Sequence, residues 1–241
     1  LLVGALAISF APILVRLSEI GPSATAFHRL FLALPALWLW LALAPDGPQG
    51  RRRPTGARDF ALLSLAGLFF ACDLAFWHWS IRLTSVANAT LLANFAPIFV
   101  TLGSLLIFAE RFRARFFLGL AVALAGLVLL MGDSAGLGQR HLLGDALGLI
   151  TAFFYGAYIL TVGRLRARFS TATVMAWSGG VAAALLVPVV LVSGESLLAT
   201  SAAGWAVLVG LALGSHLGGQ GLIAFSLAHL PAAFSSLVLL L

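Results

Sequence analysis

The sequence predicts an all-α polytopic membrane protein built from two inverted five-helix repeats. The chain is 61% hydrophobic and only 9% charged, with a mean hydropathy of +1.08. Soluble globular domains are typically about 25% charged. Apolar runs of about 20 residues, long enough for a helix to cross the hydrocarbon core, recur along the chain. Several of these runs also match one another at a constant separation of 146 residues.

The charges lie where a membrane protein carries them. The chain has fourteen arginines and no lysine, against eight acids. A nucleic-acid-binding protein would gather its basic residues on a solvated face, whereas here they form short clusters between apolar runs, which is typical of loops between membrane spans. We therefore expect the lipid bilayer, and not nucleic acid, as a partner. The single cysteine, Cys72, lies in an apolar run, so no disulfide framework is predicted.

The predicted spans follow one another with short linkers. In order, they lie at residues 1–16, 23–43, 60–81, 85–108, 114–131, 143–163, 171–192, 203–227 and 231–241. The linkers at 45–59, 110–115, 132–141 and 163–170 carry Pro, Gly and Arg, and none is long enough for a separate soluble domain. The first span begins abruptly and the last stops within a helix. We expect ten spans in the full protein, of which about nine are present here.

The repeat divides the chain into residues 1–132 and 143–241. Thr25-Ala26 falls on Thr171-Ala172, and residues 80–87 fall on 226–233. One separation that fits several helix pairs favours a duplicated unit over chance matches of apolar helices. Because a unit of five spans is odd, the second copy enters the membrane from the opposite side, as in many secondary transporters.

The arginines predict the orientation. The loops after the second, fourth and sixth spans hold ten of the fourteen: Arg51, Arg52, Arg53, Arg58, Arg111, Arg113, Arg115, Arg164, Arg166 and Arg168. The positive-inside rule places these loops, and with them the amino terminus, in the cytoplasm. The expected location is the plasma (bacterial inner) membrane.

The stretch 69–100 contains the residue that most needs an explanation, Asp73. An isolated charge is costly in hydrocarbon, and ionisable residues within spans usually serve a site. One interpretation is a neutral carboxyl held by a structural hydrogen bond. The other is a group that gains and loses a proton as a cavity alternates between the two sides. His78 lies about 140° round an ideal helix from Asp73, so a direct pair of the two is not expected.

Other polar side chains recur at helical spacing and predict a cavity between the repeats. The candidates for a substrate cavity or for coupling are Asp73, Trp77, Asn94, Tyr155, Tyr158, His216, Gln220 and Ser9. At the constant separation Ser9 pairs with Tyr155, so equivalent faces of the first and sixth spans are polar. The alternatives stay open: Trp77 fits an interfacial aromatic belt equally well, and hydroxyl side chains in spans often bond their own backbone.

Two basic residues open the second span. His28 and Arg29 are candidates for an outer vestibule that draws in substrate, although Arg29 is also long enough to reach lipid headgroups, the interpretation that we favour. No cluster of His, Cys and Asp has metal-ligand spacing, and no phosphate-binding loop or nucleophile motif occurs. We expect no catalytic residues, no metal and no cofactor.

The residues also carry a resemblance to a known family. SIRLTSVANATLLANFAPIFVTL at 80–102, FAERF at 108–112 and GLAVALAGLVLLMG at 119–132 resemble EamA-type members of the drug/metabolite transporter superfamily. The stretch 144–165 resembles the start of a second repeat, and 225–240 resembles the second-half counterpart of the turn at 80–92. The resemblance implies a transporter, often an exporter of amino acids, metabolites or toxic compounds, with a central cavity between the repeats. It implies no shared catalytic residues. Asp73 is not part of the family pattern, so its coupling role is inferred from the residue alone.

Three classes of function remain to be compared. The first is a secondary transporter of small organic solutes, with protons and a second copy of the chain as further partners left open. The second is a polytopic membrane enzyme, which would need a nucleophile with a base, or acids at a metal. The third is a non-transporting membrane scaffold. Inverted symmetry favours the first, because neither alternative requires it.

Overall fold

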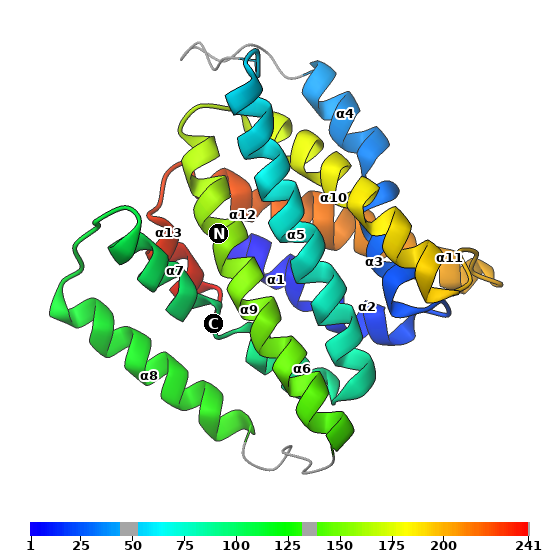
Figure 1. Ribbon diagram of the computed structural model, residues 1–241, viewed down its shortest axis with the longest axis horizontal. Coiled ribbons are helices and arrows are strands. Elements are labelled where there is room, and N and C mark those ends of the chain that lie inside the picture. Colours follow the sequence, from blue (N-terminus) through cyan, green and yellow to red (C-terminus); the bar gives the residue numbers. More distant parts are fainter. Residues whose placement is uncertain (44–52, 132–138, 241) are drawn as a thin grey trace.

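The computed structural model describes residues 1–43, 53–131 and 139–240, and within them it is all helical. Arg51, Arg52 and most of the linker 132–141, which enter the sequence predictions above, lie outside the described residues. The helices are α1 (Leu2–Ser9), α2 (Ala11–Leu17), α3 (Pro22–Phe31), α4 (Leu34–Leu43), α5 (Ala57–Leu83), α6 (Val86–Ala93), α7 (Ala96–Leu106), α8 (Ala114–Met131), α9 (Gln139–Arg166), α10 (Thr171–Ser193), α11 (Ala202–Val209), the π-helical segment η1 (Gly210–Gln220), α12 (Gly221–Ser226) and α13 (Ala232–Val238). Figure 1 labels all of them except η1, which lies between α11 and α12.

Within the described residues, six helical segments are long and apolar enough to cross a membrane. They are Pro22–Leu43, Ala57–Leu83, Val86–Leu106, His141–Arg166, Thr171–Ser193 and Ala202–Ser226. Two shorter apolar segments, Leu2–Leu17 and Ala114–Leu129, lie at the first and fifth predicted spans. α1, α4 and α8 all carry exposed large apolar side chains (Leu, Val, Phe or Trp), as a lipid-facing surface requires. The prediction of an all-α polytopic membrane protein is confirmed.

Several predicted spans are not continuous helices. The first, second and fourth are each interrupted, at Phe10, at Leu32–Ala33 and at Asn94–Phe95. Each interruption is followed within three residues by a proline near the start of the next helix, namely Pro12, Pro35 and Pro97. Proline has no N–H to donate and its ring crowds the preceding turn, so the helical bonding pattern ends there and restarts.

The two halves of the chain are packed into one another. α5, from the first half, lies along α9, from the second half, and also packs against α10. α1 packs in turn against η1. At the separation of 146 residues α5 corresponds to the segment α11–η1–α12 and α9 to α1–α2, so these two contacts are equivalent. The main hydrophobic core accordingly draws on both halves, with Leu37, Leu63 and Phe70 beside Ile159 and Leu186.

A close helix contact joins α5 to α10 at Gly67. A Cβ atom there would lie 2.7 Å from the backbone oxygen of Ser178 and 2.7 Å from Cβ of Val181. Small residues let membrane helices approach closely, and overpacking such a site typically costs about 1–3 kcal/mol. We expect Gly67→Val to lower the thermal midpoint of the detergent-solubilised protein clearly. Gly126→Val on α8, where an added Cβ meets nothing within 4 Å, is the control. Equal midpoints for the two variants would contradict the contact's importance.

Candidate functional site

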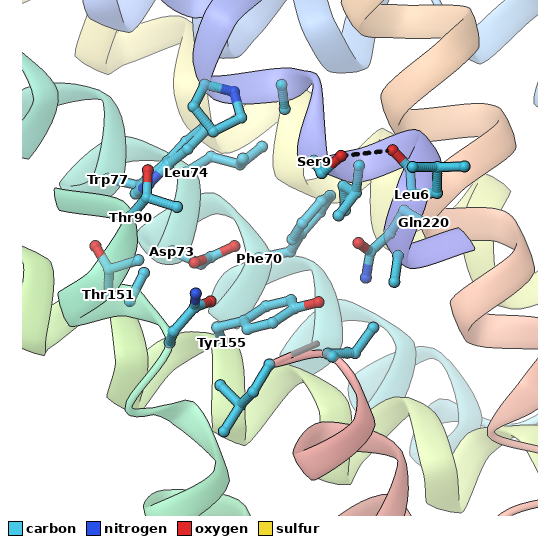
Figure 2. Close-up of a pocket in the computed structure, with 18 of the residues that line it drawn as sticks. Leu6, Ser9, Phe70, Asp73, Leu74, Trp77, Thr90, Thr151, Tyr155 and Gln220 are labelled. Atoms are coloured by element: carbon cyan, nitrogen blue, oxygen red, sulfur yellow. Dashed lines mark hydrogen bonds between the residues drawn. The ribbon is translucent and has the colours of Figure 1, made fainter. Parts of the chain in front are cut away.

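A cavity of about 490 Å³ lies between the two halves of the chain. Its lining residues come from α1, α2, α3, α5, α6, α9, η1 and the end of α13 with the turn after it: Leu2, Ala5, Leu6, Ile8, Ser9, Ala11, Pro12, Arg29, Phe70, Asp73, Leu74, Trp77, Thr90, Ala93, Asn94, Thr151, Tyr155, Gln220, Val238, Leu239 and Leu240. Figure 2 shows most of these residues, apolar and polar, as sticks. A volume of this size is typical of small-molecule sites, which occupy about 300–1,000 Å³.

The lining follows the internal repeat. Five pairs of lining residues are separated by 146 positions: Ala5 and Thr151, Ser9 and Tyr155, Leu74 and Gln220, Ala93 and Leu239, and Asn94 and Leu240. Equivalent surfaces of the two halves therefore face each other across the cavity. A site where repeat-related surfaces meet lies on the pseudo-symmetry axis, which is where secondary transporters with inverted repeats hold their substrates.

Asp73 projects from α5 into this cavity. Its side chain lies between Trp77, Thr90 and Thr151 on one side and Tyr155 on the other (Figure 2). The residue is 7% exposed, and within the described part of the chain its carboxyl makes no hydrogen bond or ion pair. The nearby His78 is turned away and bonds the carbonyl oxygen of Leu74 through Nδ1 at 2.7 Å. The carboxyl is thus available to a ligand or a proton in the cavity.

Arg29 also lines the cavity, from α3. The residue is 3% exposed, and its Nη2 donates to Ser215 Oγ on η1 at 3.2 Å. Its Cζ lies 5.9 Å from the ring centroid of Trp77. The interpretation of Arg29 as a side chain that reaches lipid headgroups is therefore wrong. α3 is short and packs between α10 and η1, which turns this residue toward the interior and not toward the bilayer.

The two charges in the cavity are not joined directly. Arg29 and Asp73 are close enough to interact electrostatically. The two ion pairs found among the described residues lie elsewhere, between Arg164 and Glu110 and between Arg168 and Asp59. Arg29 and Asp73 thus both line the cavity without forming a salt bridge with each other.

The second half contributes a group of neutral polar residues. Tyr155 and Gln220 line the cavity, and the buried amide of Gln220 lies close to the hydroxyls of Tyr155 and Tyr158. Tyr158 does not line the cavity; its ring stacks on Phe70 at 4.5 Å and its hydroxyl donates to Met175 Sδ at 3.8 Å. His216 is also buried and does not line the cavity. Its ring stacks on the ring of Phe70, with 5.3 Å between the two centroids.

The remaining candidates divide between the cavity and the packed interior. Trp77, Asn94 and Ser9 line the cavity, and Ser9 Oγ donates to the carbonyl oxygen of Leu6 at 2.8 Å. His28 does not: its Nδ1 lies 2.9 Å from the carbonyl oxygen of Ala24, and its ring packs edge-on against Trp205 at 5.7 Å. The structure therefore places His28 in a helix contact, apart from Arg29's position on the cavity.

Most of the lining residues were not among the candidates, and Phe70, Thr90 and Thr151 are three of these. Phe70 precedes Asp73 by three positions, so helical spacing alone places it on the same face. Thr90 and Thr151 lie on polar stripes that also contain Asn94 and Tyr155, but a threonine in a span usually bonds its own helix. Thr151 does so, donating to the carbonyl oxygen of Leu147 at 2.9 Å.

Comparison with known proteins agrees with this arrangement. Residues 1–132 match the EamA-like transporter family. The chain belongs to this family. An "Uncharacterized transporter" from Archaeoglobus fulgidus is 26% identical to this EamA-like chain over 190 residues, which are 77% of the chain and 63% of that relative. A protein of known crystal structure shares the fold, with a TM-score of 0.77 at 21% identity over 99% of this chain and 81% of the other. The EamA-like chain is thus a multi-pass membrane protein with an inverted-repeat helical fold.

Proposed function

We propose that this chain provides the substrate pathway of a secondary transporter that moves small organic solutes by alternating access. The cavity on the repeat axis carries the proposal, because it combines a volume suited to a metabolite with one acidic and one basic side chain. Export is the proposed direction, on the resemblance to EamA-type exporters. Membership of a transporter family and the name of the archaeal relative favour this function over a membrane enzyme or a scaffold.

Asp73 is the proposed coupling group. Charged side chains within a bilayer are costly, and they persist where they bind an ion, a proton or a substrate. Asp73 faces the cavity without a bonding partner among the residues described, so its carboxyl can exchange a proton with water whenever the cavity opens. A structural aspartate would instead be held by donors from neighbouring helices.

The orientation is proposed from the arginines. Arg164 pairs with Glu110 at 3.3 Å and Arg168 with Asp59 at 2.8 Å, which brings three arginine-bearing loops to one end of the bundle. The positive-inside rule makes this end cytoplasmic and the membrane the bacterial inner membrane. The amino terminus is then cytoplasmic as well.

Transport by the full-length protein tests the proposal directly. Reconstituted in proteoliposomes, it should move at least one compound from a panel of amino acids, nucleosides and cationic drugs, and an imposed pH gradient should drive accumulation. The control is liposomes that contain the double variant Trp77→Ala and Tyr155→Ala, which lacks two large side chains that line the cavity. If no compound on the panel moves, with or without a gradient, or if the double variant moves a compound as fast as the parent protein does, the transporter proposal fails.

A further inference from the structure

Two glutamates at one end of the bundle cap helices that belong to the opposite half of the chain. At this end α2, α3, α11 and the last turn of α10 come together (Figure 1). Glu195, which follows α10, accepts a hydrogen bond from the backbone N–H of Ala24 at 2.8 Å. Glu19, which precedes α3, accepts from the backbone N–H groups of Thr200 and Ser201 at 3.0 and 3.1 Å. Each contact crosses between the halves, and the two run in opposite directions.

The sequence of α3 leaves its first turn without a cap of its own. Its N-cap is Gly21, which has no side chain, and its first residue is Pro22, which has no N–H. The Ala24 N–H is therefore an unpaired donor at the positive end of the helix dipole unless another segment supplies an acceptor. Glu195 supplies it. Gly194, with φ of 66°, ends α10 in the left-handed conformation that glycine adopts without strain and turns the chain toward α3.

The cap of α11 also depends on the other half. Ser201 is the N-cap residue, and its Oγ accepts from the N–H of Gly204 at 2.9 Å. The same hydroxyl donates to Glu19 Oε1, and Thr200 Oγ1 donates to Glu19 Oε2 at 3.0 Å. These hydrogen bonds, that from Ser201 above all, hold the pKa of the Glu19 carboxyl below its usual value, so it is charged at neutral pH. Beneath the caps, Ile20 and Ala24 pack against Val190 and Leu208.

The other end of the bundle is joined by different chemistry. There the links between the halves are the ion pairs Arg168–Asp59 and Arg164–Glu110. α10 runs from one end to the other: Arg168 lies just before its first turn and Glu195 just after its last. Its 23 residues at about 1.5 Å each place the two sets of contacts roughly 35 Å apart. Phe70 and Asp73, which line the cavity, lie near the middle of α5, and α5 packs against α10.

We infer that Glu19 and Glu195, with the helix starts that they cap, form a capping latch that closes one end of the cavity and breaks when that end opens. Alternating access requires the halves to separate at one end while they stay joined at the other. The latch is suited to this because its bonds are exposed or half-buried and can exchange for water, so opening costs little. This inference adds a gate to the proposed function and does not depend on which solute is carried.

Spin-label distances test the latch in the full-length protein. Labels at Leu17→Cys and Leu198→Cys, both exposed and on opposite halves, report the separation of this end in a Cys72→Ser background. We expect the double variant Glu19→Gln and Glu195→Gln in nanodiscs to raise the long-distance population by about threefold to tenfold, the change that loss of helix caps predicts. Gln keeps the shape and one acceptor oxygen, so the helices themselves should persist.

A matched variant separates a gate from general loosening. Glu110→Gln removes an ion pair at the other end and should leave the Leu17–Leu198 distances unchanged or shorter. Unchanged distances in the Glu19 and Glu195 variant, or equal lengthening in Glu110→Gln, would overturn the latch. If the double variant does not fold, Ser201→Ala, which removes only the shared hydroxyl, is measured in the same way and must lengthen the distance. Because no substrate is added, a failed transport assay leaves this test unaffected.

Discussion

Asp73→Asn is expected to abolish uphill transport by the full-length protein while leaving it folded and inserted. Asn has nearly the shape of Asp and can form hydrogen bonds, but it cannot gain or lose a proton. Asp73 lines the cavity and bonds no other described residue, so the substitution removes no hydrogen bond or salt bridge that supports the fold. In proteoliposomes the variant should lose accumulation driven by a pH gradient, by about a hundredfold if the carboxyl carries the proton. Exchange of labelled for unlabelled substrate at equal pH should persist.

Asp145→Asn provides the control for this substitution. Asp145 lies near the start of α9 and does not line the cavity, although its Oδ1 is buried without a partner in the described structure. It should transport as the parent protein does. If Asp73→Asn accumulates substrate normally against a gradient, Asp73 has a structural role and the coupling proposal is wrong.

Hydropathy was sufficient to locate the helices, but not to describe their shape. Apolar runs near 60–81 and 171–192 became the continuous helices α5 and α10. The runs at 23–43 and 85–108 are also apolar enough to cross a membrane, yet the structure divides each of them ahead of Pro35 and Pro97. A window average treats a proline as one residue among twenty, whereas the backbone responds to the hydrogen bond that it removes. The π-helical turn η1 has no comparable signal in the sequence.

The sequence identified Asp73 because its cost does not depend on its neighbours: a carboxyl anywhere in so apolar a stretch needs an explanation. Arg29 was harder to place, since an arginine near a helix start can turn toward headgroups or toward the interior. The direction of the Arg29 side chain is set by its contacts with Ser215 and Trp77, which come from η1 and α5. The capping latch could not be predicted from the sequence either, because its partners come from distant segments: Glu19 and Thr200 are 181 positions apart.

The repeat and the charges obey different symmetry. Five pairs of lining residues are separated by the constant 146 positions, so the backbone around the cavity has approximate two-fold symmetry. The counterpart of Asp73 is Gly219 and that of Arg29 is Met175, so the second half offers neither charge. Both ionisable groups therefore approach the cavity from the first half, and the second half opposes them with Tyr155 and Gln220. A solute held there meets charge on one side and neutral donors and acceptors on the other.

Arg29→Gln is expected to lower transport by about tenfold or more, the effect of losing a hydrogen bond from a charged group to the substrate. The guanidinium provides the positive charge on the cavity, and its loss leaves Asp73 without a counter-charge in a low-dielectric site. Ser215→Ala, which removes the hydrogen bond to Arg29 but keeps the positive charge, is the control and should lower transport less than Arg29→Gln does.

The double variant Arg29→Gln with Asp73→Asn shows whether the two charges depend on each other. Each single change leaves one buried charge unbalanced, whereas the double change leaves none, so the stability losses should not add. We expect the double variant to be about 1 kcal/mol more stable than the summed losses of the two single variants predict, as measured by thermal unfolding in detergent. Strict additivity would mean that Arg29 and Asp73 act independently, and the asymmetric charge pair would then have no role in holding the cavity. If the stability losses do not add and both single variants also lose transport, the interaction between Arg29 and Asp73 is one that a bound substrate must replace.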